Sequence, residues 1–239
     1  MNDTKSSAIK RPKLKVCGMK FQENILEIAS LKPDYMGFIF YGKSPRNFEN
    51  EIPEISSETK KTGVFVNASA NFILEKASRY NLHAIQLHGE ENPQFCTQLR
   101  TELKKIQETS EVEIIKVFSV NDEFDFEVLF PYEDEVDYFL FDTKGKNKGG
   151  NGIAFNWDIL KAYPSEKPFF LSGGIGIEEL VSIKSLIAEF RKKGKQDLLY
   201  AIDVNSKFEI EPGVKNMEVL AKFQKNLKFL SSDLLDFGG

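Results

Sequence analysis

A cysteine near the start of the chain is the first residue whose type and position could support chemistry. Cys17 ends a short apolar segment, residues 14–17, and is followed by Gly18, which allows a sharp backbone turn. Alternate residues of a strand share one face, so Lys15 and Cys17 are expected to point the same way. A thiolate at the end of a strand is a candidate base. Most free cysteines are small buried hydrophobes, so position alone leaves both interpretations open.

A carboxylate at the end of another apolar segment is the second candidate. Asp142 follows the run Tyr-Phe-Leu-Phe at residues 138–141 and shares a strand face with Leu140. A carboxyl group at the edge of an apolar barrel suits general acid catalysis, because desolvation favours its protonated form. An aspartate that only caps the turn is the alternative interpretation.

Glycines and small polar residues follow two later strands. The amide groups of Gly173 and Gly174 could approach an anion closely, and Asn205 and Ser206 add hydrogen-bond donors. Phosphate sites of parallel barrels often lie at the loops after strands seven and eight. A tight turn that requires glycine is the alternative.

Four further polar residues fall near predicted strand ends. Arg46 lies in a loop and is a candidate clamp for a carboxylate, because a guanidinium binds one bidentately. Gln86 and His88 share a strand face, although a structural histidine is an equal alternative. Asp203 lies near the end of the last predicted strand.

Eight short apolar segments alternate with helical patterns along the chain. Strands are predicted at residues 14–17, 35–40, 62–66, 84–88, 113–118, 137–142, 168–172 and 198–204. Helices are predicted at residues 22–31, 52–61, 71–80 behind an Asn cap, 93–107, 122–130, 156–163, 177–193 and 215–229. This alternation predicts a parallel α/β fold, and eight units predict a single-domain (β/α)₈ TIM barrel. The candidate residues would then meet at the carboxyl ends of the strands.

Composition limits the function classes. The chain has 239 residues, 41% hydrophobic content and a net charge of −4, which argues against a general nucleic-acid binder. Neither a disulfide framework nor zinc-ligand spacing is present, and Cys96 is expected to pack in a helix. No apolar run reaches the length needed to span a bilayer. A polar extension at residues 1–13 without a signal core, together with the absence of a disulfide framework, predicts a cytoplasmic protein. Residues 231–239 are predicted to form a polar tail.

Several ordered segments together resemble the phosphoribosylanthranilate isomerase family of tryptophan biosynthesis. The similarity runs from about residue 14 to residue 229 and includes Lys-Val-Cys-Gly-Met at 15–19, Gln-Leu-His-Gly-Glu at 86–90, Phe-Asp-Thr-Lys at 141–144 and Leu-Ser-Gly-Gly at 171–174. Further segments also match the family. They are Gly-Phe-Ile-Phe-Tyr at 37–41 with Lys-Ser-Pro-Arg at 43–46, Gly-Val-Phe-Val-Asn at 63–67, Gly-Gly-Asn-Gly at 149–152 and Ala-Ile-Asp-Val-Asn-Ser at 201–206.

The resemblance implies a monomeric or homodimeric barrel, without a cofactor, that acts on a small-molecule substrate. Composition and residue spacing predict no metal site and no nucleic-acid or membrane partner. The implied reaction is the Amadori rearrangement of N-(5-phosphoribosyl)anthranilate. In the implied roles, Cys17 is the general base and Asp142 the general acid, Arg46 holds the anthranilate carboxylate, and Asp203 lies near the ribose. Gly173, Gly174, Asn205 and Ser206 would surround the phosphate. Gln86 and His88 are expected to line the pocket because they share a strand face. A free thiol has a pKa of about 8.5, and Lys15 is expected to help ionise Cys17.

Two segments depart from the family pattern. Lys207 occupies a position where glycine is common in the family. Because lysine adopts a positive φ less easily than glycine, this argues against the family's backbone contact to phosphate at that position. Residues 146–152 carry Asn where Ser or Thr is usual, and this glycine-rich loop is predicted to act as a mobile lid.

Other functions remain open from sequence. Indole-glycerol-phosphate synthase would need a strand-end Lys and Glu, and Lys116 lies inside its predicted strand. A barrel that only binds a phosphorylated ligand would need neither Cys17 nor Asp142. The related histidine-pathway substrate carries two phosphates, and no second Gly-Gly pair follows the third or fourth strand, so the single-phosphate substrate is favoured.

Overall fold

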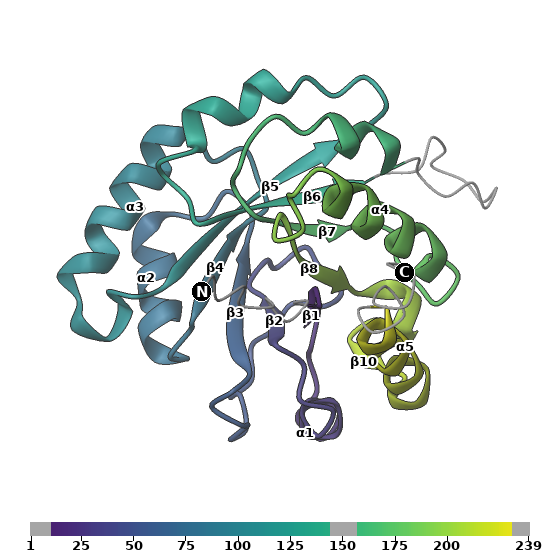
Figure 1. Ribbon diagram of the computed structural model, residues 1–239. Helices are drawn as coiled ribbons and strands as arrows, with labels where there is room; N and C mark the ends of the chain where they lie inside the picture. The colour runs from purple at the N-terminus through teal and green to yellow at the C-terminus, as the bar shows by residue number, and fades with distance from the viewer. Residues whose placement is uncertain (1–10, 144–156, 231–239) are drawn as a thin grey trace, which may run out of the picture.

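The computed structural model describes residues 11–143 and 157–230, in which eight parallel strands close into a barrel. Neighbouring strands follow chain order, and β8 pairs with β1 to close the ring (Figure 1). The strands are β1 (Lys13–Val16), β2 (Tyr35–Ile39), β3 (Lys60–Phe65), β4 (Ala84–Leu87), β5 (Glu113–Val120), β6 (Tyr138–Thr143), β7 (Phe169–Ser172) and β8 (Leu199–Val204). The predicted (β/α)₈ barrel is confirmed.

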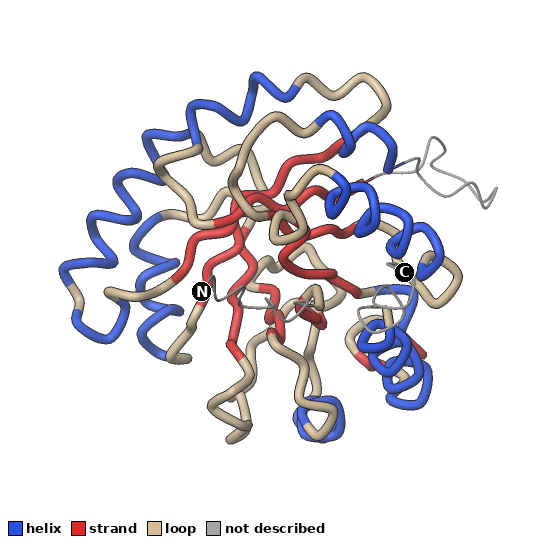
Figure 2. Tube along the Cα trace, in the orientation of Figure 1, coloured by secondary structure: helices blue, strands red, loops and turns tan. Residues whose placement is uncertain are grey.

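Helices surround the strands on the outside of the barrel (Figure 2). The α-helices are α1 (Gln22–Ala29), α2 (Ala70–Arg79), α3 (Pro93–Lys105), α4 (Leu180–Lys192) and α5 (Met217–Phe229). Shorter 3₁₀ helices are η1 (Gln107–Thr109), η2 (Phe126–Tyr132), η3 (Trp157–Ala162) and η4 (Ser206–Phe208). Among the described residues, no helix is both long and apolar enough to cross a membrane.

Side chains of each strand alternate between two cores. Phe139 and Phe141 pack outward in the large core under the helices, whereas Leu140 packs inside the barrel. The interior core is formed by Tyr35, Ala84, Ile115, Val117, Leu140, Phe170 and Ala201. Because both strand faces are covered, the strands are continuous apolar runs in the sequence.

Some predicted helices differ in the structure. Residues 51–56 form irregular chain in place of the helix predicted at 52–61, and residues 60–61 already belong to β3. Only Ile52 and Ile55 of that segment pack against the core, and one apolar turn containing Pro53 is too short to nucleate a helix. The segments predicted as helices at 122–130 and 156–163 form the 3₁₀ helices η2 and η3, and η2 contains Pro131.

The cap of α2 is also different from the prediction. Ser69, rather than Asn71, accepts a hydrogen bond from the amide of Phe72, so α2 begins at Ala70. The side chains of Asn92 and Asn216 cap α3 and α5 in the same way. Each cap satisfies an amide group that has no partner within its helix.

A short antiparallel hairpin separates β8 from α5 and was not predicted. Its strands are β9 (Glu209–Glu211) and β10 (Val214–Lys215), joined by a turn with Gly213 at a φ of 91°. The helix predicted from residue 215 therefore begins at Met217. The predicted lid at residues 146–152 and the tail at 231–239 lie outside the described residues.

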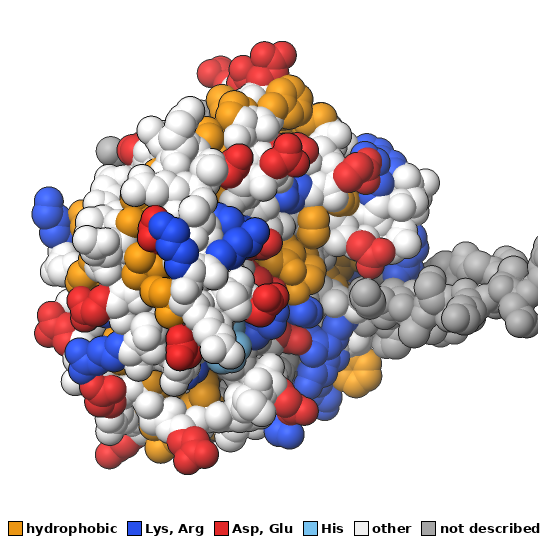
Figure 3. Space-filling model, turned by 90° about the vertical axis from the view of Figure 1, so that its left-hand side faces the viewer, with side chains coloured by type: hydrophobic (Ala, Val, Ile, Leu, Met, Phe, Trp, Pro, Cys, Tyr) orange, Lys and Arg blue, Asp and Glu red, His pale blue; other side chains and the backbone are white. Residues whose placement is uncertain are grey.

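The surface is of mixed charge on the face shown in Figure 3. Lys and Arg side chains alternate there with Asp and Glu, with small apolar areas between them. This mixture agrees with the small net charge of −4.

A buried ion pair fixes the loops that follow β3 and β4. Lys116 of β5 contacts Glu91 at 3.1 Å, and each side chain is 3% exposed. The Glu91 carboxylate also accepts the amides of Asn67 and Gly89, and Lys116 donates to the Gly89 carbonyl at 2.6 Å. The pair therefore holds together two loops at the carboxyl end of the barrel.

Replacing Glu91 by Ala should destabilise the protein strongly, because it leaves the Lys116 ammonium buried and unpaired. Loss of one partner of a buried ion pair costs about 3–5 kcal/mol. Urea unfolding followed by circular dichroism measures the change. The adjacent exposed Glu90 is the matched control, and a Glu90→Ala variant should unfold like the wild type. Equal stabilities of the Glu91 and Glu90 variants would contradict this account.

Candidate active site

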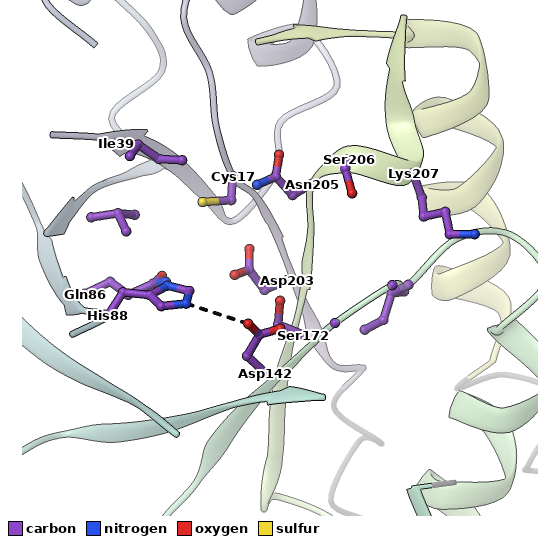
Figure 4. A pocket seen from close by; sticks show the side chains of 14 residues that line it. Cys17, Ile39, Gln86, His88, Asp142, Ser172, Asp203, Asn205, Ser206 and Lys207 are labelled. Atoms are coloured by element: carbon purple, nitrogen blue, oxygen red, sulfur yellow. Dashed lines mark hydrogen bonds and ion pairs between the residues drawn. The ribbon is translucent and has the colours of Figure 1, made fainter. Parts of the chain in front are cut away.

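A cavity of about 190 Å³ lies where the strands end at their carboxyl side (Figure 4). Every predicted site residue except Arg46 lines it. The lining residues are Cys17, Ile39, Val64, Gln86, His88, Asp142, Ser172, Gly173, Gly174, Ile175, Asp203, Asn205, Ser206 and Lys207. Residues far apart in the chain thus share one cavity, because parallel strands present all their carboxyl ends at the same edge.

Cys17 is held at the end of β1 by close contacts with the neighbouring strands. Its amide donates to the Val204 carbonyl at 2.9 Å. A side chain at Gly37 of β2 would place its Cβ 2.9 Å from the Cys17 Sγ atom, so only glycine fits there. Gly18, at a φ of 78°, then turns the chain away from the strand, as predicted.

A buried ion pair lies beside the thiol. Lys15 Nζ is 2.9 Å from Asp203 Oδ2, and the two side chains are 0% and 5% exposed. Burial alone would lower the pKa of Lys15, but Asp203 and Cys17 raise it above its ordinary value. Burial raises the pKa of Asp203, and Lys15 opposes that rise. Lys15 is therefore held as an ammonium group on the same strand face as Cys17, as predicted.

The thiol itself is harder to ionise than a free cysteine. Burial raises the pKa of Cys17, and the nearby Asp203 carboxylate adds to that rise. Lys15 and Lys215 act in the opposite direction. The net direction is upward, so Lys15 limits the rise in the pKa of the thiol without reversing it.

Two buried acceptors in the cavity wall lack hydrogen-bond donors among the described residues. They are Oδ1 of Asp203 and Oε1 of Gln86. An unpaired buried acceptor is costly, so these atoms are suited to receive hydroxyl groups of a bound molecule. Figure 4 shows Asp203 between Cys17 and Asp142.

His88 connects Gln86 with Asp142. The Gln86 amide nitrogen is 3.1 Å from His88 Nδ1, and His88 Nε2 is 3.6 Å from Asp142 Oδ2. When the amide donates to Nδ1, the proton of the neutral imidazole lies on Nε2, which faces Asp142. Asp142 itself is 22% exposed, so it faces the cavity rather than the core. His88, which sequence left open, is therefore part of the site.

The far side of the cavity carries the glycine-rich loop and the end of β8. Gly173 and Gly174 have φ angles of 99° and 66°, which suit a loop whose amides converge on an anion. Ser206 and Lys207 lie opposite in η4. Lys207 is exposed and is the one Lys or Arg among the described cavity-lining residues. Its backbone lies in a 3₁₀ helix, so the position accommodates a lysine.

Arg46 lies outside the cavity wall but close to Cys17. Its Cδ atom would be 2.8 Å from a Cβ added at Gly18. Its guanidinium is bound by Glu209 of β9, with Nε–Oε1 at 2.8 Å and Nη2–Oε2 at 2.6 Å.

Glu209 and its second partner Lys215 were missed by sequence analysis, because they lie in the unpredicted hairpin. The only signal was a pair of opposite charges flanking the Pro-Gly turn at 212–213.

Within residues 11–143 and 157–230, no cluster of three His, Cys, Asp or Glu side chains could hold a metal ion.

The closed parallel barrel, with a thiol, carboxylates and a glycine-rich loop at one cavity, defines a (β/α)₈-barrel enzyme. A family model described as N-(5'-phosphoribosyl)anthranilate isomerase matches residues 14–226, and the chain belongs to this family. The isomerase of Parabacteroides distasonis is 42% identical over 216 residues, covering 88% of this chain and 90% of that protein. The chain is accordingly an isomerase of tryptophan biosynthesis.

Solved structures agree with this assignment. The phosphoribosyl anthranilate isomerase of Thermotoga maritima superposes with a TM-score of 0.73 at 31% identity, covering 91% of this chain and 98% of that one. Another phosphoribosyl anthranilate isomerase has a TM-score of 0.69 at 28% identity over the same shares of the two chains. That structure is a complex with reduced 1-(o-carboxyphenylamino)-1-deoxyribulose 5-phosphate.

Alkylation of Cys17 by iodoacetamide should follow a pKa above that of a free thiol, because burial raises the pKa of Cys17. Only the thiolate reacts, so the rate should rise with pH into the alkaline range. A Lys15→Met variant should shift the midpoint to still higher pH, since Lys15 lowers the pKa of the thiol. Mass spectrometry of the labelled peptide measures the rate, with Cys17→Ala as the control. A midpoint unchanged by Lys15→Met would show that the ammonium does not act on the thiol.

Proposed function

We propose that this chain converts N-(5'-phosphoribosyl)anthranilate into 1-(2-carboxyphenylamino)-1-deoxyribulose 5-phosphate, with Asp142 as general acid and Cys17 as general base. The observation that carries the proposal is that both groups line one cavity of about 190 Å³. The cavity also contains a glycine-rich loop suited to a phosphate and unpaired acceptors suited to sugar hydroxyls. Its chemistry therefore matches each part of an aminosugar phosphate.

Asp142 acts in the first step. Its carboxyl group donates a proton to the ring oxygen of the ribose, the bond between C1 and that oxygen breaks, and the nitrogen lone pair forms an iminium ion. His88, 3.6 Å from the carboxylate, is the positioning residue for Asp142. The imidazole lies beside the carboxyl group and helps keep it directed into the cavity.

Cys17 acts in the second step. The thiolate removes the proton from C2, and the electrons of that C–H bond form the enolamine, which tautomerises to the ketone. A thiol with a raised pKa is a stronger base once it is ionised, and the iminium charge favours the ionised form. Lys15 supplies a permanent positive charge on the same strand face.

The sugar and the phosphate occupy opposite sides of the proposed complex. Asp203 and Gln86 accept hydrogen bonds from the ribose hydroxyls through their unpaired oxygens. The phosphate binds to the amides of the Gly-Gly loop at 173–174, to Asn205 and Ser206, and to the Lys207 ammonium.

Arg46 holds the carboxylate of the anthranilate ring in this proposal. It lies near Cys17 and carries a positive charge, which the Glu209 carboxylate reinforces by raising the pKa of the guanidinium. The substrate then spans the site from Arg46 to the phosphate loop.

Alternative chemistries fit the site less well. Indole-glycerol-phosphate synthesis needs a strand-end lysine, but Lys116 is buried and bonded to Glu91 and the Gly89 carbonyl. It does not belong to the described cavity wall. A barrel that only binds phosphate would not need Cys17 and Asp142 facing one another across the cavity.

Cys17→Ala and Asp142→Asn should each abolish turnover, because each removes one proton-transfer group while leaving the phosphate loop intact. We expect turnover to fall by at least about a thousandfold, while the affinity for the reduced product analogue changes by less than about tenfold. Loss of phosphoribosylanthranilate fluorescence measures turnover, and calorimetry measures binding. Cys96→Ala, at a buried helix position away from the cavity, is the matched cysteine control. Full activity of Cys17→Ala would reject the assigned base.

Lys207→Ala should weaken substrate binding by about tenfold, the effect of losing one charge-assisted contact to phosphate. The KM should rise while kcat changes little, because the contact is the same in the ground state and the transition state. The loss should be smaller at high salt, since Lys207 is exposed and its charge is screened. Lys225→Ala, on the exposed face of α5, is the control. A KM equal to that of the wild type would place the phosphate away from Lys207.

A further inference from the structure

The β9–β10 hairpin after β8 contains a buried charge cluster that sequence analysis did not predict. Glu209 of β9 accepts hydrogen bonds from the Arg46 guanidinium, from Lys215 Nζ at 2.7 Å and from the Gly213 amide at 3.1 Å. The side chain of Glu209 is 5% exposed and that of Lys215 is 0% exposed. These contacts tie the hairpin to the loop after β2, which lies more than a hundred residues earlier.

Electrostatics keep Glu209 ionised. Burial alone would raise its pKa, but hydrogen bonds from Arg46 and Lys215 lower the pKa of Glu209 to about 2. The carboxylate is therefore ionised at neutral pH. A permanent charge in a buried position constrains the groups bound to it.

The contact with Glu209 uses only one edge of the guanidinium. Nε and Nη2 of Arg46 bind the two carboxylate oxygens, at 2.8 Å and 2.6 Å. The other edge, formed by Nη1 and the second proton of Nη2, makes no hydrogen bond among the described residues. A carboxylate can bind bidentately to that edge. Glu209 thus fixes the plane of the guanidinium while leaving a second binding edge open.

Lys215 determines the charge of the cluster and the orientation of Asn205. Arg46 and Glu209 alone are neutral as a pair. Burial lowers the pKa of Lys215 and Glu209 opposes that fall, and the Lys215 ammonium then makes the cluster net positive. Its ammonium is 2.7 Å from the Asn205 side chain, and because an ammonium only donates, the atom it contacts is Oδ1. The amide nitrogen of Asn205 is then directed to the cavity side, as in Figure 4.

We propose that Glu209 and Lys215 are positioning residues that give the site its selectivity for an aromatic amine bearing an ortho carboxylate. This inference rests on the proposed function, in which Arg46 binds the carboxylate of the substrate. Glu209 orients the open edge of Arg46, and Lys215 compensates the negative charge that Glu209 would otherwise set against the substrate. Neither residue touches the reacting atoms.

Binding of two ligands distinguishes a positioning role of Glu209 and Lys215 from a purely structural role. One is reduced 1-(o-carboxyphenylamino)-1-deoxyribulose 5-phosphate, and the other is the same compound with a phenyl ring that lacks the carboxyl group. Calorimetry gives the dissociation constant of each for the wild type, Glu209→Gln and Lys215→Met. The ratio of the two constants reports the contribution of the carboxylate alone. Glu211→Gln, at an exposed position of the same strand, is the matched control.

The wild type and Glu211→Gln should prefer the carboxylated ligand by about tenfold or more, as expected for a charge-assisted bidentate contact. Glu209→Gln and Lys215→Met should lose most of this preference. Glu209→Gln should keep its affinity for the carboxyl-free ligand within about twofold of the wild type, whereas Lys215→Met, which also releases Asn205 at the phosphate, should weaken both ligands by a further common factor. Turnover by Glu209→Gln should show a raised KM and a kcat changed by less than about threefold.

An equal loss of affinity for both ligands in Glu209→Gln would overturn the proposal, because it would indicate only a disturbed hairpin. An unchanged preference would overturn it as well. If Glu209→Gln does not fold, as judged by circular dichroism, Lys215→Met decides the question, because it leaves the Arg46–Glu209 pair in place. Wild-type turnover of phosphoribosylanthranilate is measured in parallel. Its absence rejects the proposed function, whereas turnover with an unaltered preference in the variants rejects only the role of the hairpin.

Discussion

The site depends on one buried ion pair, between Lys15 and Asp203. These residues are paired in register across β1 and β8, the two strands that close the barrel. Each charge offsets the cost of burying the other, so the ion pair forms where closure of the barrel brings the two strands together. The pair forms a polar layer above the apolar interior core and lies directly beside the Cys17 thiol. Barrel closure and the protonation of the thiol are therefore linked through the same two side chains.

Similar long-range charge pairs hold the remaining parts of the site. Glu91 with Lys116 joins the loops after β3 and β4, near His88, and Glu209 with Arg46 joins the hairpin to the loop after β2. In each case a buried carboxylate receives several donors from separate segments. Buried ion pairs of this kind help supply the rigidity that a catalytic arrangement needs.

Much of the architecture was predictable because it depends on local patterns. Alternation of apolar segments predicted all eight strands, and strand parity put Cys17 on one face with Lys15 and Asp142 on one face with Leu140, which packs inside the barrel. Prediction of secondary structure failed where the apolar residues have no regular spacing along the chain. The segment at residues 51–56 contains two isolated isoleucines and a proline, and its packing against the barrel replaces the expected helix. The cap at Ser69 was missed because Asn71, two residues later, is an equally good cap by type.

The sequence by itself determined the fold class, the edge at which the site lies and the family to which the chain belongs, since these depend on residue types at fixed spacing. Only the tertiary structure decided which charges meet. It showed that the Arg46 guanidinium binds Glu209 along one edge and that Lys215 orients Asn205. It also showed that burial raises the pKa of Cys17 despite the neighbouring Lys15. The reason is physical: strand and helix patterns arise from neighbours in the chain, whereas the energy of a buried charge depends on groups that only folding brings within hydrogen-bond distance.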